Sequence, residues 1–511
     1  MLVSYIIKED MQKPKFGFCR GNWPARNKIA AVNRGTAVKS IQKGQEKIME
    51  KKQTRQKEPF FTKDRSFYQT FFRLMLVVAL QNLVAYSVNM LDNIMLGSYS
   101  QNALSGAATV NQIFFVVNQF ALAIGNALIA LSAQYWGRKD TDSIRRLTWI
   151  TLLYSMVAAG IILVICSAMP ERFLGLFTDS SQIIEQGVVY LKYLRWTFVL
   201  FLISNLLIAM LRSVETVQIS FWISVLSLII NGGINYTLIF GHFGFPQMGI
   251  KGAAIGTLTA RIVEFLIVLF YLVKIDQKVM LMKGGSFREI FSISSRKLWK
   301  DFFRVSTPII ISGMLWAVAV PVQTAILGHL SADAIAANSV STTFFQYLKV
   351  IVVAVSSASA VVIGKDIGQG DKARVRSDGR TLSVIDIMIG VLLAILLCIL
   401  RRPLLTMYDL TAEAMILADH LIVIMSVVMV GMSYQMPVSV GILQGGGDTK
   451  FCMYLNMIST WVIVMPLSFL TAFVWKLPVE WVVVAVQSDQ IFKCIPVFLR
   501  FRGYRWMHKL T

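Results

Sequence analysis

The chain alternates between long apolar stretches and short polar segments. A helix needs about 20 residues to cross the hydrocarbon core of a bilayer, and twelve stretches reach that length. They lie roughly at 67–96, 102–134, 147–168, 185–210, 217–240, 252–273, 302–328, 334–363, 381–400, 412–442, 451–474 and 478–499. The pattern predicts an all-α polytopic membrane protein with twelve transmembrane helices, six in each half of the chain.

The two halves of this pattern are related by an internal repeat. Residues 92–137 align with residues 323–368 without a gap, at a constant offset of 231, so that Gly137 falls on Gly368. Duplicated apolar units are common in secondary transporters, in which one repeat moves against the other around a site between them. The repeat therefore predicts two pseudo-symmetric six-helix lobes and favours transport as the function.

Lysine and arginine are concentrated in alternate loops. One set of loops, at 138–146, 274–304, 365–380 and Lys450, is rich in these residues. The other set holds only Arg172, Lys251, Arg401, Arg402 and Lys476. By the positive-inside rule the first set is cytoplasmic, and an even number of spans places both termini in the cytoplasm as well. The expected location is the inner (plasma) membrane.

This pattern divides the chain into four segments. They are a basic cytoplasmic tail at 1–60, a first lobe at 61–273, a cytoplasmic linker at 274–301 and a second lobe at 302–511. The tail holds fourteen Lys and Arg against five Asp and Glu, which is typical of a disordered segment. It is either a polybasic arm on the anionic inner leaflet or an upstream extension, with the natural start at Met49. We favour the second alternative.

Composition supports a membrane protein and argues against several other classes. Hydrophobic residues make up 55% of the chain and charged residues 15%. The net charge of +22 lies mostly beside apolar spans, where lipid headgroups attract it, so nucleic acid is not the expected partner. The sequence has no Walker motif, Asp-rich metal motif or CxxC spacing, so we expect neither ATP use, nor an enzyme, nor a cofactor.

Five motifs, in this order, carry a family resemblance. They are LDNIMLG at 91–97, AQYWGRKD at 133–140, LSLIINGGINYTLIFG at 226–241, GFPQMGIKGAAIGT at 244–257 and LQGGGDTK at 443–450. Over residues 60–505 the chain resembles the multidrug and toxic compound extrusion (MATE) transporters, most closely the bacterial members. The resemblance implies a V-shaped pair of six-helix lobes that exports organic, often cationic, compounds in exchange for Na⁺ or H⁺.

A cation or proton site is expected in the first lobe, at Asp92, Asn231, Asn235 and Thr257. Asp92 lies about a turn and a half from the outer end of the first span, and a carboxylate there is costly unless it binds a proton, a cation or a partner. Asn231 and Asn235 lie four residues apart on one helix face, and Thr257 follows the next turn at a similar depth. Their hard oxygen atoms suit Na⁺ or a protonatable site. In the family these four positions match such a site, often with a second Asp in place of Asn235.

The second half offers no equivalent acid in the repeat, because Asp92 aligns with Gln323. Some family members have a second-lobe sodium site with acids on spans 7 and 10. Here span 7 has none, and span 10 offers only Tyr434 and Gln435, so we expect the charge-coupled step in the first lobe.

Three other charged residues of the apolar spans are candidates. Lys349 is near the middle of span 8 and is expected to face the central cavity or to meet an acid. Arg261 and Glu264 lie three residues apart on span 6 and are expected to pair with each other. With Tyr434 and Gln323, they complete the candidate cavity residues.

These observations predict a secondary antiporter, functional as a monomer among membrane lipids, that exports amphipathic cationic organic compounds in exchange for H⁺ or Na⁺. Two alternatives stay open. A flippase for a lipid-linked precursor, or an exporter of an anionic metabolite, would use the positive charge of Lys349.

Overall fold

The computed structural model describes residues 60–175, 177–178, 180–282, 290–292, 295–330, 332–406, 408 and 410–510. Apart from Phe60, the expected tail at 1–60 and the alternative start at Met49 lie outside these residues. So does part of the expected linker. The described chain is helical and contains no strand.

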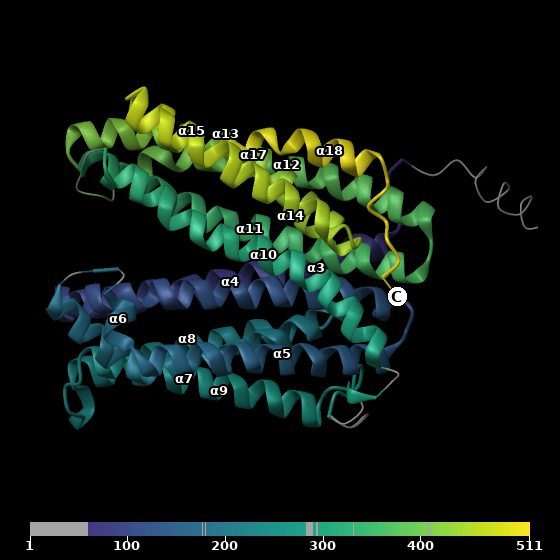
Figure 1. Cartoon of the computed structure of the whole chain (residues 1–511), viewed down its shortest axis with the longest axis horizontal. Coiled ribbons are helices and arrows are strands. Elements are labelled where there is room, and N and C mark those ends of the chain that lie inside the picture. The colour runs from purple at the N-terminus through teal and green to yellow at the C-terminus, as the bar shows by residue number, and fades with distance from the viewer. Residues whose placement is uncertain are drawn as a thin grey trace, which may run out of the picture. The chain divides into compact units, whose positions relative to one another are not determined.

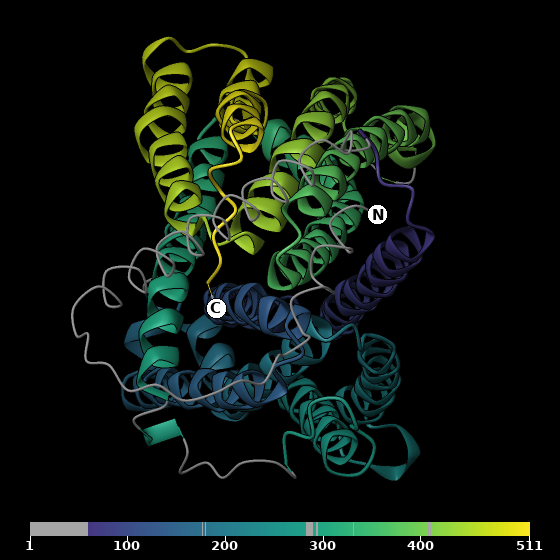
Figure 2. The ribbon, with the colours of Figure 1, turned by 90° about the vertical axis from the view of Figure 1, so that its right-hand side faces the viewer.

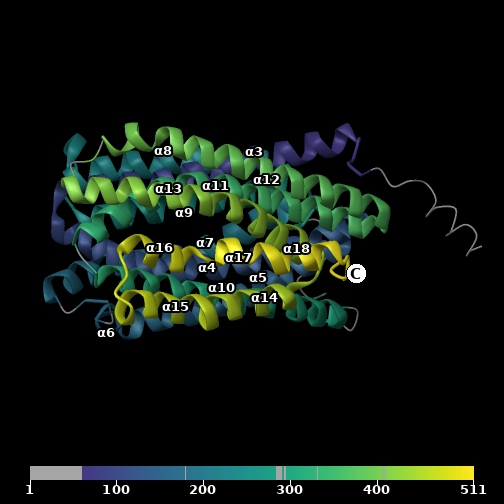
Figure 3. The ribbon, with the colours of Figure 1, turned by 90° about the horizontal axis from the view of Figure 1, so that it is seen from above.

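Twelve helices are long and apolar enough to cross a membrane, as the sequence predicts. Figures 1 and 3 show that they run along one common direction. Those of the first half are α3 (Arg65–Tyr99), α4 (Gln101–Gly137), α5 (Thr141–Ala168), α7 (Ser181–Ser213), α8 (Gln218–Phe240) and α9 (Ile250–Lys274). A short helix, α6 (Pro170–Leu174), and a 3₁₀ turn, η1 (His242–Gly244), lie in the connections.

The second half contains three continuous helices and three composite spans. The continuous ones are α10 (Arg296–Gly328), α11 (Ala332–Gln369) and α12 (Lys372–Leu405). The tenth span joins α13 (Ala412–Met436) to the π-helical η4 (Pro437–Leu443). The last two consist of α14 (Thr449–Met457), η5 (Ile458–Val464), α15 (Met465–Phe469) and η6 (Leu470–Val474), then of α16 (Val479–Gln487), α17 (Asp489–Phe492) and α18 (Cys494–Arg502).

The repeat is visible in the local structure as well as in the helix order. Asp140 and Asp371, which the repeat aligns, cap the third spanning helix of their respective lobes. The Asp140 carboxylate accepts a hydrogen bond from the Ser143 amide at 3.0 Å, and Asp371 accepts from the Arg374 amide at 3.1 Å. The same short turn with the same cap therefore starts α5 and α12.

The repeat-related glycines allow α4 and α11 to cross in close contact. A Cβ atom at Gly137 would overlap the carbonyl oxygen of Lys365, and one at Gly368 would overlap that of Gln134. The repeat aligns Gln134 with Lys365, so the two contacts are pseudo-symmetric copies of one another. Only glycine permits this backbone approach, because any side chain would meet main-chain atoms that have nowhere to move.

The hydrophobic cores do not follow the lobe boundary at the start of each half. Phe67, Phe71 and Leu74 of α3 pack into a buried cluster formed mostly by second-lobe residues. Phe302 and Val305 of α10 pack reciprocally into the main cluster of the first lobe. The beginning of the first helix of each lobe therefore packs in the hydrophobic core of the other lobe.

Polar contacts join the lobes at the end that carries the glycine crossing. Arg212 donates to the Ser357 hydroxyl at 3.1 Å, and Lys365 pairs with Glu215 at 2.5 Å. These contacts hold the two lobes against each other at this end of the molecule.

The C-terminal segment adds a strap across the same junction, and Figure 2 shows its end between the two bundles. Trp506 is buried in a second-lobe cluster, whereas Leu510 packs against the main first-lobe cluster. The Leu510 amide donates to Oε1 of Gln134 at 2.9 Å, and Nε2 of Gln134 donates to the carbonyl of Gly445 at 3.3 Å. The strap is therefore buried in the second lobe at Trp506 and contacts the first lobe at Leu510.

We predict that Gly137→Ala and Gly368→Ala each destabilise the fold. Each added methyl group would push apart two helices that are in backbone contact, and overpacking typically costs about 1–3 kcal/mol. Thermal unfolding of the purified protein in detergent, followed by tryptophan fluorescence, is the measurement. Gly160→Ala is the matched control, because a Cβ atom at that helical glycine meets nothing within 4 Å. Equal melting temperatures for all three variants would contradict the prediction.

Candidate functional site

The four residues expected to form a cation or proton site lie together in a hydrogen-bonded cluster. Nδ2 of Asn235 donates to Oδ1 of Asp92 at 2.6 Å and approaches Oδ1 of Asn231 at 3.3 Å. Nδ2 of Asn231 donates to the Thr257 hydroxyl at 3.3 Å. The chain of contacts links α3, α8 and α9 within the first lobe.

The local helix geometry explains how the cluster forms. Residues 231 and 235 are one turn apart on α8, so both amides project from the same face. On α9, Gly256 leaves the space that the Asn235 amide fills, because a Cβ atom there would collide with Oδ1 of Asn235. That oxygen is buried and accepts no hydrogen bond within the described chain. The cluster therefore contains a free buried acceptor beside a carboxylate.

A fifth residue, Tyr190 of α7, belongs to the cluster and was not predicted. It is buried, and its hydroxyl lies near the Thr257 hydroxyl and within electrostatic range of Asp92. A tyrosine in an apolar span resembles any other core aromatic in the sequence. Only the packing of α7 against α9 places it here.

Arg261 and Glu264 pair with each other, as expected, next to the cluster rather than in the middle of the protein. Nη1 of Arg261 lies 2.6 Å from Oε2 of Glu264, and its guanidinium lies 5.0 Å from the Phe201 ring centroid. The positive charge of Arg261 also acts on Asp92. The Arg261 guanidinium can attract the Asp92 carboxylate. Because Arg261 also pairs with Glu264, no buried charge is left without a partner.

Aromatic side chains meet where the two lobes face each other. Phe115 of α4 lies 5.9 Å from Trp316 of α10, measured between ring centroids, and Tyr86 of α3 lies 6.3 Å from Tyr347 of α11. The ammonium of Lys349 lies 5.1 Å from the Trp316 ring centroid, a cation–π distance. Lys349 thus adjoins the inter-lobe aromatic surface.

Gln323 and Tyr434 are not part of the Asp92 cluster. Gln323 is half-buried on α10, and Tyr434 is buried on α13 within the second lobe.

Three of the buried charged residues of the second lobe, Lys493, Asp489 and Asp386, were missed, although the rule that intramembrane charges are functional candidates would have found them. Lys493 pairs with Asp489 at 2.7 Å, and the charge of Asp489 also acts on Lys349. The third, Asp386 on α12, is buried with both carboxylate oxygens free of hydrogen bonds within the described chain. Span 7 has no acid at 302–328, and the acids of span 10, Glu413 and Asp419, lie near the start of α13 and away from Tyr434 and Gln435.

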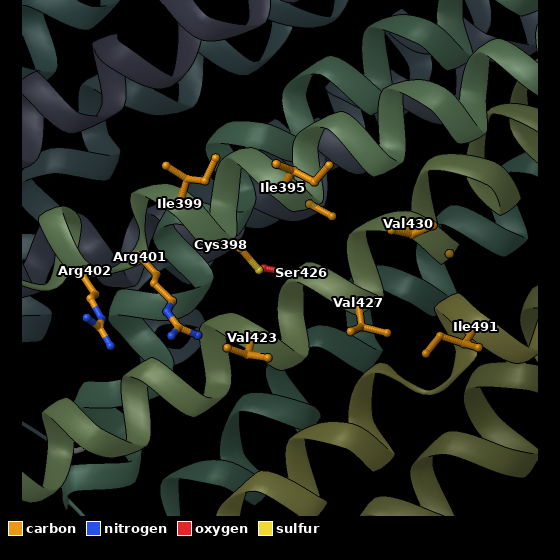
Figure 4. Close-up of a pocket in the computed structure, with 12 residues that line it drawn as sticks. Ile395, Cys398, Ile399, Arg401, Arg402, Val423, Ser426, Val427, Val430 and Ile491 are labelled. Atoms are coloured by element: carbon orange, nitrogen blue, oxygen red, sulfur yellow. The ribbon is translucent and has the colours of Figure 1, made fainter.

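A separate groove of about 880 Å³ lies between α12 and α13, with Ile491 of α17 at its side (Figure 4). Most of its lining is aliphatic, and Arg401 and Arg402 stand at one end. Ile399 and Val427 are largely exposed, which places the groove on the outer surface of the second lobe, toward lipid. It is distinct from the inter-lobe surface and from the Asp92 cluster.

Comparison with known proteins decides the family. The MatE family model matches residues 78–237 and 308–470, one block in each half of the chain. The chain belongs to the MatE family. The protein is therefore a membrane transporter rather than an enzyme, and its bacterial type and twelve spans imply the plasma membrane.

Relatives of this MatE protein match it over most of their length. It is 26% identical to the "Probable multidrug resistance protein NorM" of Rhizobium meliloti over 408 residues, which are 78% of this chain and 84% of that protein. It is 21% identical to the multidrug resistance protein MdtK of Pectobacterium atrosepticum, with 76% and 83% covered.

Solved structures share the fold. An outward-facing multidrug resistance MATE transporter superposes with a TM-score of 0.76 at 18% identity, covering 87% of this chain and 98% of that one. A mutant of the Vibrio cholerae transporter VcmN gives 0.78 at 16% identity, with the same coverage.

We predict that Gly256→Ala impairs transport by this MatE protein by displacing the Asn235 amide from Asp92. A hydrogen bond to a charged group contributes about 1.5–3 kcal/mol, so the expected loss is roughly 10- to 100-fold in transport rate at low ion concentration. Dye transport in proteoliposomes is the measurement. Gly233→Ala on α8 is the control, because a Cβ atom at that position meets nothing within 4 Å. Equal rates for the two variants would show that the Asn235 contact is dispensable.

Proposed function

We propose that this protein is a secondary antiporter that exports amphipathic organic cations in exchange for protons taken up at Asp92. The observation that carries the proposal is the buried Asp92 cluster, in which one carboxylate, two amides and two hydroxyls lie within one lobe of a two-lobe transporter. A carboxylate inside a membrane protein is retained where it binds a cation or carries a proton.

The donor arrangement favours a proton over Na⁺. Asn235 presents its N–H group, and not its carbonyl oxygen, to Asp92. A proton needs only the Asp92 carboxylate and the neighbouring dipoles, whereas a bare Na⁺ would need several oxygens turned toward it.

The inter-lobe surface fits a flat amphipathic substrate. Phe115, Trp316, Tyr86 and Tyr347 come from both lobes, and Met90 adds a thioether that contacts the Tyr347 hydroxyl at 3.0 Å. Aromatic faces and methionine adapt to varied ring systems without fixed hydrogen bonds. Several relatives are named multidrug resistance proteins, which agrees with a broad substrate range.

In this mechanism, exchange arises from opposing preferences of one two-state protein. Proton binding neutralises Asp92, weakens its attraction for the Asn235 amide and alters the packing of α3 against α8. Substrate between the lobes favours the arrangement with Asp92 ionised. Because each ligand has a different affinity for the two states, binding of one promotes release of the other.

We predict that Asp92→Asn abolishes efflux driven by a proton gradient. Asparagine keeps the size of the side chain but cannot take up a proton, so coupling is expected to fall at least about 100-fold. Proteoliposomes loaded with a fluorescent cationic dye and exposed separately to H⁺ and Na⁺ gradients provide the measurement. Glu185→Gln, an acid-to-amide change at an exposed position of α7, is the matched control. Efflux by the wild type under a Na⁺ gradient alone would assign the site to Na⁺.

Lys349 favours a second candidate function, export of an anionic amphiphile or flipping of a lipid-linked precursor. Its ammonium adjoins the inter-lobe aromatic surface, while the neighbouring Asp489 is already paired with Lys493. The surface therefore carries a positive charge that would attract an anionic group. A solved Pyrococcus furiosus transporter of the same fold is described as having a binding pocket of reversed polarity that suggests a different function.

We predict that Lys349→Met improves export of a cationic dye. Loss of one nearby positive charge removes a repulsion on the order of 1 kcal/mol, which corresponds to about fivefold in apparent affinity. The apparent KM for dye efflux is the measurement, and Lys251→Met, on an exposed lysine that also lies over an aromatic ring, is the control. If Lys349→Met instead abolished transport of an anionic amphiphile and left cations unaffected, the second candidate would be correct.

A further inference from the structure

We propose that Asp386 is a second proton-binding carboxyl group of this transporter, located in the second lobe where α12 packs on the end of α13. The inference rests on the proposed proton antiport and adds a second site to it. It places a titrating group in each lobe, on helices that the internal repeat does not relate, since Asp386 aligns with Ser155.

The first argument is that the Asp386 carboxyl group is buried without a hydrogen bond or an ion pair to offset its loss of hydration. The residue is 1% exposed, lies fourteen residues into the 34-residue helix α12, and has both carboxylate oxygens free of hydrogen bonds. Asp386 forms no ion pair within the described chain. Burial is therefore the main influence on whether its carboxyl group is charged or neutral. An ionised carboxylate cannot persist in such a place, so the group must hold a proton whenever this conformation is populated.

The second argument is a group of unsatisfied hydroxyls on the neighbouring helix. The hydroxyls of Ser433 and Tyr434 on α13 are both buried and without hydrogen bonds, and the charge of Asp386 acts on Tyr434. Gly390, one turn after Asp386, packs against Ser433, so the same face of α12 meets the end of α13. Three polar side chains that each lack a partner therefore gather at one helix contact.

The third argument is the backbone at this contact. Pro437 begins η4 and has no N–H to donate to the carbonyl of Ser433, as an ordinary helical residue would. π-helical segments inside spanning helices are frequent at functional sites, because they break the regular hydrogen-bond ladder. A small rotation of this segment would bring the Tyr434 and Ser433 hydroxyls toward Asp386 and stabilise its ionised form.

The groups around Asp386 suit a proton better than a metal ion. From α13 the titratable group facing it is Tyr434, with Cys494 of α18 beyond, and neither α11 nor η4 contributes a charged partner to it among the described residues. One carboxylate and two hydroxyls offer few oxygen ligands. Proton transfer here moves only H⁺ between solvent and a carboxylate oxygen, and requires no other reactant.

The groove between α12 and α13 extends along α12 toward this carboxyl group. Ala394, two turns beyond Asp386 on the same stripe of α12, lines the groove between α12 and α13, and so does Val430. The groove stops where Gly390 packs on Val430 and Ser433. The close contact of α12 with α13 at Gly390 therefore lies between Asp386 and the end of the groove.

The decisive measurement is the number of protons exchanged per substrate molecule, taken from the pH gradient and membrane potential at which substrate flux reverses in proteoliposomes. We expect Asp386→Asn to exchange one proton fewer than the wild type while still transporting. Asp92→Asn is expected to lose coupling, and Glu185→Gln to keep the wild-type ratio. An unchanged ratio in Asp386→Asn, or a change that depends on Na⁺ instead of pH, overturns the proposal.

A second measurement is independent of transport and of the Asp92 proposal. Infrared difference spectra of the wild type between acidic and alkaline pH should contain the carbonyl stretch of a protonated carboxyl group that disappears on titration. Asp386→Asn should remove this band, and Asp386→Glu should shift it, which assigns the band even if the amide variant folds poorly. A band that never titrates, with or without substrate, means a permanently neutral structural acid and refutes the inference. Absence of any pH-driven transport in the wild type would refute the proposed function instead.

Discussion

Close backbone contact between α4 and α11 is the constraint on which the arrangement of the two lobes depends. Gly137 and Gly368 allow each helix to approach the carbonyl oxygens of the other, and in a bilayer such packing replaces the hydrophobic driving force that water would supply. Once the helices cross there, Lys365 lies within reach of Glu215, and Gln134 can bind both Gly445 and the C-terminal strap. The polar contacts follow from the crossing, since they need both lobes in place.

Buried charges are distributed unequally between the lobes. In the first lobe, Asp92 accepts a hydrogen bond from Asn235, and Arg261 and Glu264 form an ion pair nearby. In the second lobe, Asp489 and Lys493 neutralise each other, whereas Asp386 has no partner within the described chain. Because a lone charge in a low-dielectric interior is costly, each unpaired carboxyl group marks a place where protonation can depend on conformation. Two duplicated lobes can therefore contribute differently to one exchange cycle.

The exchange of core segments between lobes bears on how such a cycle could proceed. The start of α3 packs with the second lobe and the start of α10 with the first, so the lobes cannot separate at this end as independent bodies. Asp92 lies farther along the same helix α3, beyond the shared segment. A change at the Asp92 cluster can thus reach the other lobe through one continuous helix, provided that α3 bends or shifts between two arrangements.

The sequence by itself determined the twelve spans, their grouping by the repeat and the membership of Asp92, Asn231, Asn235 and Thr257 in a shared layer. Hydrocarbon thickness fixes helix length, and helix periodicity fixes which residues share a face, so both are local properties of the chain. Tertiary structure alone decided that Tyr190 joins this cluster, that Gly256 makes room for Asn235, and that Asp386 lies where α12 packs on the end of α13. These contacts depend on the rotation and spacing of neighbouring helices. Side-chain packing over the whole lobe sets that geometry, and no short stretch of sequence contains it.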